Sequence, residues 1–231
     1  MIELRPHASL GGFSNAWLTT KMHVALGDLG AKAHTPVGAL RIWNDDDIAA
    51  QAGFPLHAHR DVEIVSYIRE GSIVHRDDLG SESRIEAGDV QVMSAGTGIR
   101  HAEFNGASTR SRVFQIWLDP RTPGRTPRWD TARFPRASRD GRLVTLVSGD
   151  GDDGALYVDA DARLLGAGLH AGQVVTHALP RGRCAYLVTT DGPLTLNGTT
   201  MAAGDGAVVR DEAVVTLRAE APTEVLLLEL A

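Results

Sequence analysis

Short apolar runs rich in Val, Ile and Leu recur along the chain, and turn-forming residues separate them. Glu63–Ile68, Arg112–Leu118 and Val225–Leu230 are examples. Runs of about 4–8 residues at this spacing predict the many strands of a β-sandwich or β-barrel. Asn197-Gly198 predicts a tight hairpin, because both central residues of a type I′ turn need a positive φ. Helix signals are weak, and the one short helix or turn that we expect is Asp45–Ala50, where aspartates would cap it.

The two halves of the chain carry similar landmarks. Glu70-Gly71 follows one predicted strand, and Gly88-Asp89 precedes another. In the second half, Asp191-Gly192 and Gly204-Asp205 take the same positions with a shorter insert between them. Repeated landmarks of this kind indicate an internal duplication, in which two copies of one fold stand in tandem.

The stretch Asp119–Arg136 differs from both halves, because it holds four prolines and five arginines and shows little periodicity. Proline lacks the N–H that a sheet needs and fixes φ, so we expect an extended connector outside the sheets. We therefore divide the chain into an N-terminal domain at residues 1–120, a connector at 121–138 and a C-terminal domain at 139–231.

Charge and composition exclude several classes of protein. The formal net charge of -6 at pH 7 argues against direct binding of nucleic acid, which needs a cationic surface. No apolar run approaches the roughly 18 residues of a membrane helix, and the N-terminus lacks the pattern of a signal peptide. We therefore expect a cytoplasmic protein without membrane contact. The single cysteine, Cys184, excludes an intrachain disulfide and is expected to be a buried, inert thiol.

Two short motifs carry the chemistry, His57-Ala58-His59 and His101-Ala102-Glu103. In a strand, side chains at i and i+2 leave on the same face, so each motif presents two ligands side by side. Two such strands would bring three imidazoles and one carboxylate to one point. Such a set suits a divalent metal such as iron, copper, nickel, manganese or zinc. We predict a metal site formed by His57, His59, His101 and Glu103.

The surroundings of these motifs resemble the cupin superfamily and, more specifically, the pirin family. The segments that carry the pirin resemblance are His57–Tyr67, Glu70-Gly71, His75–Asp77 and Gly88–Glu103. Within the family the chain is similar to the short bacterial members, which share Ala39–Asp46 and the Val225–Leu230 ending. The resemblance implies an all-β fold of two tandem cupin barrels, each a double-stranded β-helix or jelly roll.

Resemblance to pirins also implies a reaction of the quercetin 2,3-dioxygenase type, in which a flavonol-like ring is opened with O2 and carbon monoxide leaves. By the same analogy, Glu103 would act as a general base toward the flavonol hydroxyl while lying near or on the metal. We expect one divalent transition metal, with Fe(II) favoured and Cu, Ni, Co, Mn and Zn left open.

Two other functions stay open. Some pirin relatives are described as metal- and redox-dependent partners of transcription factors, so the protein would be a non-enzymatic regulator that acts through a protein partner. A non-redox cupin, such as a zinc isomerase or a binder of phenols, would use the same ligands. Metal identity separates these functions, because zinc would contradict the oxygenase and iron, copper, nickel or cobalt would be compatible with it.

The identity of the carboxylate ligand is a choice between Glu103 and Glu63, which sits where a general cupin places its carboxylate. If Glu103 binds the metal, Glu63 would accept a hydrogen bond from an imidazole N–H or would be an exposed strand residue. The residues that flank the site in sequence, and that would line either a pocket or the core, are Phe54, Ile64, Met93 and Trp117.

The second half lacks the ligand set. Counted from the shared landmarks, the counterparts of His57, His59 and His101 are His177, Leu179 and Leu217. We therefore expect the C-terminal domain to be a metal-free cupin, in which His177 and His170 are structural.

Overall fold

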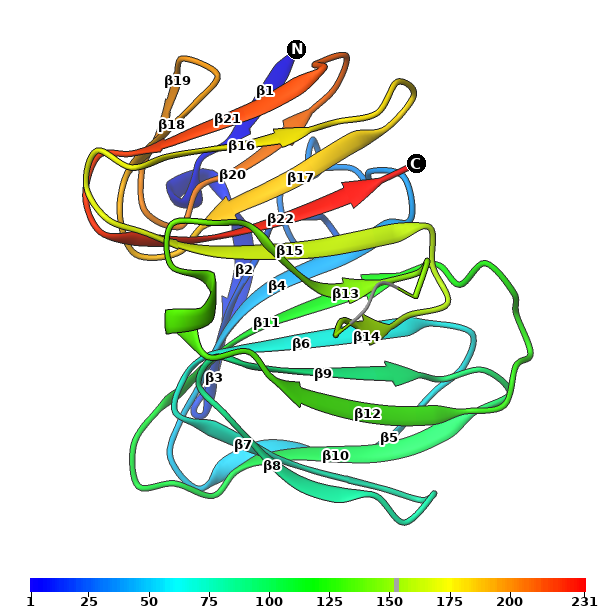
Figure 1. The fold of residues 1–231 in the computed structure, drawn as a ribbon. Coiled ribbons are helices and arrows are strands. Elements are labelled where there is room, and N and C mark those ends of the chain that lie inside the picture. Colours follow the sequence, from blue (N-terminus) through cyan, green and yellow to red (C-terminus); the bar gives the residue numbers. More distant parts are fainter. Residues whose placement is uncertain (152–153) are drawn as a thin grey trace.

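The computed structural model describes residues 1–151 and 154–231 as an all-β structure with two 3-10 turns, η1 (His7–Ser9) and η2 (Arg136–Arg139). No helix in this part of the chain has the length and hydropathy needed to cross a membrane. The strands form two sheets of seven and two of four. Figure 1 shows these sheets as stacked layers, with the N-terminal half below and the C-terminal half above.

The N-terminal half pairs a large sheet with a small one. The large sheet has the order β12 (Arg128–Arg133), β9 (Asp89–Ser94), β6 (Glu63–Glu70), β11 (Ser111–Leu118), β4 (Leu40–Ile48), β3 (Leu18–Met22) and β2 (Gly11–Ser14). The small sheet has the order β5 (Ala52–His59), β10 (Ile99–Asn105), β7 (Ser72–Asp77) and β8 (Glu82–Glu86).

The C-terminal half repeats this arrangement. Its large sheet has the order β1 (Ile2–Arg5), β20 (Gly206–Val209), β17 (Cys184–Thr189), β22 (Thr223–Leu230), β15 (Ala162–Leu169), β13 (Val144–Ser148) and β14 (Leu156–Tyr157). Its small sheet has the order β16 (Val174–Ala178), β21 (Val214–Ala219), β18 (Leu194–Leu196) and β19 (Thr199–Met201). The predicted hairpin between β18 and β19 is confirmed, because Asn197 and Gly198 both have positive φ. The matching sheets support the predicted duplication.

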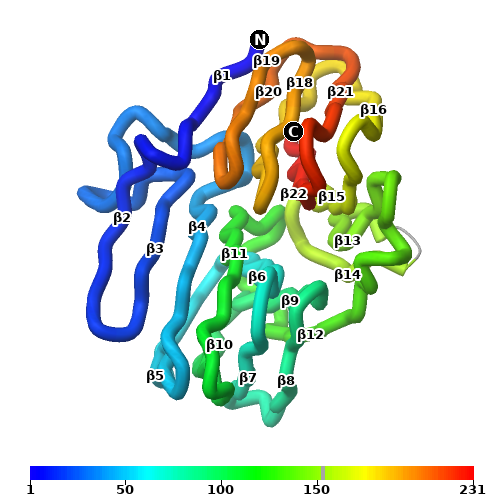
Figure 2. Tube along the Cα trace, turned by 90° about the vertical axis from the view of Figure 1, so that its left-hand side faces the viewer, coloured from blue at the N-terminus to red at the C-terminus, as the bar shows by residue number. Residues whose placement is uncertain are grey.

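The first strand crosses to the other half. β1 pairs with β20, from Ile2 opposite Val209 to Arg5 opposite Gly206. Figure 2 shows this N-terminal end among the C-terminal strands. Backbone hydrogen bonds therefore join the two halves. The division into domains at residues 1–120, 121–138 and 139–231 stays a prediction. Within it, the first strand of the N-terminal domain joins a sheet of the C-terminal domain.

The expectation that the proline-rich stretch stays outside the sheets is wrong for Arg128–Arg133. These residues form β12, which pairs with β9. β12 lies at the edge of its sheet, where only one side of the strand needs ladder hydrogen bonds, so flanking prolines are tolerated.

The helix expected at Asp45–Ala50 is also absent, because Asp45–Ile48 belongs to β4. Aspartate is a poor strand former, but arginines offset this on one face of the strand. Arg69 binds Asp45 at 2.6 Å, and Arg110 binds Asp47 at 2.5 Å. The run of aspartates therefore marks a strand with partners rather than a helix cap.

The two large sheets pack face to face through the main apolar core. Alternate residues of a strand point to opposite faces, so Tyr67 and Phe114 of one sheet meet Tyr186 and Leu226 of the other in one buried cluster. The remaining face of each large sheet is covered by the small sheet of its own half. Central strands such as β22 are therefore buried along their whole length, which explains the apolar run Val225–Leu228 within it.

The interiors of the two halves differ. In the C-terminal half, one continuous apolar cluster, which includes Leu187 and Leu217, fills the space between the sheets. In the N-terminal half there are two smaller clusters, one that contains Ile68 and one that contains Ile64. Ser66 lies between these two residues on the same face of β6, so polar side chains separate the clusters. The candidate site lies in this polar interior of the N-terminal half.

A buried ion pair lies between the two large sheets. Arg139 is fully buried and donates to the Glu224 carboxylate and, at 2.7 Å, to the Tyr67 hydroxyl. The Tyr67 hydroxyl in turn donates to Glu224 at 2.6 Å. Both bonds to Glu224 go to Oε1, and its Oε2 lies 3.6 Å from the guanidinium of the exposed Arg136.

Replacing Arg139 with Met is expected to lower the free energy of unfolding by about 3–5 kcal/mol, because Glu224 would stay buried with only the exposed Arg136, 3.6 Å away, as a cation partner. Urea unfolding measures this value. Arg142→Met is the control, because Arg142 is exposed and donates to the Ser138 carbonyl, and we expect a change within about 0.5 kcal/mol. Equal stability of Arg139→Met and the unaltered protein would contradict this account of the interface.

Candidate metal centre

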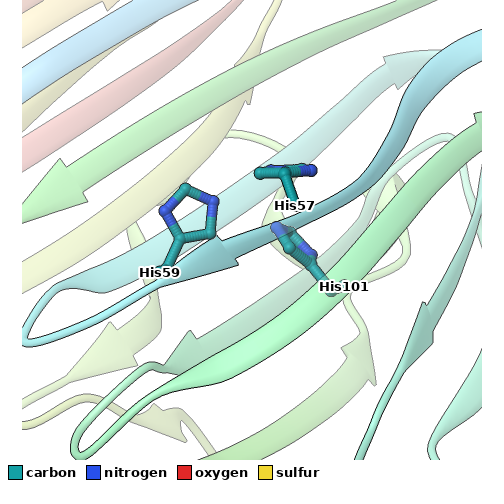
Figure 3. A group of neighbouring side chains, drawn as sticks. All are labelled: His57, His59 and His101. Atoms are coloured by element: carbon teal, nitrogen blue, oxygen red, sulfur yellow. The ribbon is translucent and has the colours of Figure 1, made fainter.

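Strands β5 and β10 bring the two histidine motifs together. They pair antiparallel, with His101 opposite His57 and Ile99 opposite His59. The rings of the three histidines project to the same side of these strands (Figure 3). One ring nitrogen of each histidine lies within 4.8 Å of the others, and the ring centroids are 4.5, 4.8 and 5.0 Å apart. The predicted grouping of these imidazoles is present in the structure.

Two of these imidazoles are held in the neutral form. Burial, together with the neighbouring His57, lowers the pKa of His59 to about 4. Burial, followed by the neighbouring imidazoles, lowers the pKa of His101 to about 3. A neutral imidazole keeps a lone pair on one ring nitrogen, which is the form that binds a metal. Near pH 7 both side chains therefore have a nitrogen free to act as a ligand.

Hydrogen bonds select which ring nitrogen carries the proton. His57 Nδ1 lies 2.8 Å from the Pro55 carbonyl oxygen, which only accepts, so Nδ1 donates and Nε2 keeps the lone pair. Behind His101, His75 Nε2 donates to Asp77 at 3.0 Å, and His75 Nδ1 accepts from His101 Nδ1 at 3.5 Å. His101 Nε2 is buried and has no hydrogen-bond partner in the part of the chain that the structure describes. A buried polar atom normally has a partner, and a bound metal ion would supply one for this nitrogen.

Glu103 reaches the same region from β10, and two glutamines of the large sheet hold its carboxylate. Gln91 donates to Oε1 at 2.5 Å, and Gln115 donates to Oε2 at 2.8 Å. Trp129 Nε1 donates to the Gln91 oxygen and Trp117 Nε1 donates to the Gln115 oxygen, both at 3.0 Å. An indole N–H only donates, so each amide oxygen faces a tryptophan and each amide NH2 faces Glu103.

This network suits an ionised Glu103, because both carboxylate oxygens accept hydrogen bonds. Burial raises the pKa of Glu103, while His75 and the amide donors act in the opposite direction. Glu103 forms a second group of ligand atoms within 4.8 Å with His75 and His101, and it lines the same cavity as His57 and His59. The four predicted residues are therefore neighbours, with His101 common to both groups of ligand atoms.

Glu63 has neither of the roles expected from the sequence. It is buried, and its Oε2 accepts from Ser94 Oγ of the neighbouring strand β9 at 2.7 Å and from the backbone N–H of Asp159, in the C-terminal half, at 3.2 Å. His59 and Glu63 are four residues apart, a spacing that would place both side chains on one face if they shared a strand. They lie on different strands, because Asp61 has a positive φ and the chain turns there between β5 and β6. The rule that alternate residues share a face holds within one strand and does not apply across a turn.

A cavity of about 240 Å³ opens beside the imidazoles. Of the flanking residues, Phe54 and Trp117 line it, whereas Ile64 and Met93 lie in the apolar core. The other residues of its wall are Phe13, Leu18, Thr20, Met22, Leu26, Leu29, Asn44, Asp46 and Gln115. Sequence reasoning missed the polar members of this wall, and the signal that could have found them is the polar run Asn44–Asp47 inside a buried strand.

The equivalent position in the C-terminal half keeps one histidine, His177, and is otherwise occupied by apolar side chains of the C-terminal core, Leu179, Val215 and Leu217. β16 pairs with β21 so that His177 lies opposite Val215, just as His57 lies opposite His101. Val215, rather than Leu217, is therefore the counterpart of His101; β20 is two residues shorter than β9, so the count from the landmarks ran two residues too far. His177 instead bonds to Glu229 at 2.7 Å.

Comparison with known proteins gives the family. The Pirin family model matches residues 4–118, and the model of the quercetinase C-terminal cupin domain matches residues 145–230. A pirin-like protein of Caulobacter vibrioides is 47% identical over 232 residues, which span 100% of each chain. The chain belongs to the pirin family. The predicted all-β fold of two tandem cupins is thereby confirmed.

Two further relatives bear on chemistry. A quercetin 2,3-dioxygenase of Escherichia coli K12 is 36% identical over 231 residues, which cover 100% of this chain and 99% of that protein. The crystal structure of the Escherichia coli pirin YhhW in complex with nickel(II) has a TM-score of 0.93 and 34% identity, and it covers 100% of this chain and 99% of that one.

Replacing His101 with Ala is expected to weaken metal binding by more than about 100-fold, because it removes a ligand whose free nitrogen points into the site. The protein should stay folded, since the main core lies elsewhere. Metal content after equilibration with ferrous iron measures this. His177→Ala is the control and should leave metal content unchanged; full occupancy in His101→Ala, or metal loss in His177→Ala, would contradict the assignment.

Proposed function

We propose that the protein is a metal-dependent dioxygenase of the quercetin 2,3-dioxygenase type, which opens a flavonol-like ring with O2 and releases carbon monoxide. The observation that carries this proposal is the convergence of three imidazoles, two of them held neutral, beside a cavity with aromatic walls. The name of the Escherichia coli relative with 36% identity supports the same activity.

In this proposal His57, His59 and His101 hold one divalent transition metal, with Glu103 near or on it. Imidazole nitrogens and a carboxylate oxygen suit Fe(II), which we favour, and also Cu, Ni, Co and Mn; they suit Zn as well, but bound Zn would contradict the oxygenase. The nickel complex of YhhW supports binding of a metal from this series. When bound, the metal would supply a Lewis acid that lowers the pKa of a flavonol hydroxyl.

The protein's own side chains would position the substrate and move its proton. Glu103 would accept the proton of the flavonol hydroxyl, because the hydrogen bonds to both of its oxygens suit an ionised carboxylate and burial makes it more basic. Gln91 and Gln115 would keep its oxygens in place during this transfer. Phe54 and Trp117 would contact the planar rings and exclude water from them.

The test is carbon monoxide release from quercetin and O2 by protein that has been loaded with ferrous iron under anaerobic conditions. The wild type should release carbon monoxide and His101→Ala should not. Gln115→Met should react at least about tenfold more slowly at equal metal content, because one oxygen of Glu103 loses its donor. No release above His101→Ala by fully loaded wild type would contradict the proposal and favour the redox-dependent regulator that acts through a protein partner.

A further inference from the structure

Three polar side chains line one wall of the cavity beside the imidazoles. They are Thr20 on β3 and Asn44 and Asp46 on β4. Thr20 pairs directly with Asp46 across the two strands, and Met22 pairs with Asn44, so the three side chains lie on the same face of the large sheet. The cavity that they line also contains His57, His59 and Glu103.

Each of these three residues has a buried oxygen that makes no hydrogen bond of good geometry with the described residues, although the Thr20 hydroxyl lies close enough to act on the Asp46 carboxyl, whose pKa is raised by burial to about 7. The atoms are Thr20 Oγ1, Asn44 Oδ1 and Asp46 Oδ1. Thr20 and Asp46 are each only 2% exposed. A buried polar atom without a partner costs free energy, and native structures contain few of them. Three such atoms at adjacent positions of one cavity wall indicate a place where a ligand supplies the missing hydrogen bonds.

The neighbouring polar side chains do not share this property. On the opposite face of β4, Asp45 and Asp47 each have an arginine partner. On the same face of the sheet, Gln115 donates to Glu103 and Gln91 donates to Ser66. Within the interior of the N-terminal half, the unpaired oxygens of the described residues are therefore confined to the cavity wall; another, Glu224 Oε2, lies outside this interior, between the two large sheets.

We propose that Thr20, Asn44 and Asp46 form a specificity-determining site that binds hydroxyl groups of the substrate away from its metal-binding end. The inference rests on the proposed function, which places the other end of the substrate at the imidazoles. A phenolic hydroxyl both donates and accepts, so it matches the Thr20 hydroxyl and the carbonyl-type oxygens of the other two residues. The three residues would then make the cavity prefer flavonol-like rings that carry hydroxyls at the far end over rings that lack them.

The apolar part of the wall agrees with this class of ligand. Phe13, Leu18, Met22 and Phe54 contribute apolar surface to the same cavity. A ligand with a flat aromatic frame would contact these side chains, while its hydroxyls would reach the three oxygens. A site built to bind hydroxyls rejects an analogue that lacks them, because the buried oxygens then stay unpaired.

The experiment compares binding of quercetin and 3-hydroxyflavone to metal-loaded protein under anaerobic conditions, where no turnover occurs. Both probes carry the 3-hydroxyl, and quercetin adds hydroxyls on its other positions. The wild type should bind quercetin at least about tenfold more tightly. Thr20→Val, which keeps the shape and removes the hydroxyl, should weaken quercetin binding by about 5–10-fold and leave 3-hydroxyflavone unaffected.

Thr19→Val is the matched control, because Thr19 is the next residue on β3, is exposed and bonds to Ser14 at 2.8 Å. It should change neither affinity. Asp46→Leu should also reduce the preference for quercetin, and all variants should keep their metal content, since none of these residues belongs to the proposed ligand set. If Asp46→Leu does not fold, Thr20→Val alone decides the question.

The outcomes separate the two proposals. Binding of both probes with equal affinity, unchanged in Thr20→Val, would overturn this inference and leave the proposed function standing. Binding of neither probe to fully metal-loaded wild type would contradict the proposed function, and the inference would fall with it. Loss of preference in Thr20→Val but not in Thr19→Val is the result that we expect.

Discussion

The face-to-face packing of the two large sheets is the interaction on which the rest of the structure depends. It buries one face of each cupin in a common apolar core and encloses the ion pair of Arg139 with Glu224. The C-terminal half adds a second, continuous core of its own. Because stability comes from these two regions, the interior of the N-terminal half is free to carry buried imidazoles, a buried carboxylate and a cavity, each of which costs stability.

The two cupins share one strand arrangement, but their inner surfaces have different chemistry. In the N-terminal half, the register of β10 against β5 shifts between His101 and Glu103, whereas β21 pairs with β16 without a shift. A bulge of this kind redirects a side chain, and here Glu103 meets the two glutamines of the opposite sheet. In the C-terminal half, Val215 and Leu217 join the apolar cluster, so this half stabilises the protein without taking part in the candidate site.

Much of this could be predicted from the sequence, and the limits have physical causes. Strand periodicity placed most of β6, β11 and β22 correctly, and the i, i+2 spacing of the histidines predicted that their side chains share a face. Both signals are local. The partners of Glu103 could not be predicted in this way, because Gln91 and Gln115 reach it from separate strands of the opposite sheet. The prediction of a helix at Asp45–Ala50 was wrong for the same reason, because the arginine partners of these aspartates are distant in sequence.

The central claim is that the imidazoles of His57, His59 and His101 converge to hold one metal ion in the N-terminal cupin. Anomalous diffraction at the iron edge, from crystals grown with ferrous iron, tests it most directly. The account predicts one strong peak about 2.0–2.3 Å from a ring nitrogen of each histidine, with Nε2 as the atom from His57 and His101, and with the Glu103 carboxylate beside it. A peak in the C-terminal half, or one that contacts His75 and leaves out His57 and His59, would contradict it.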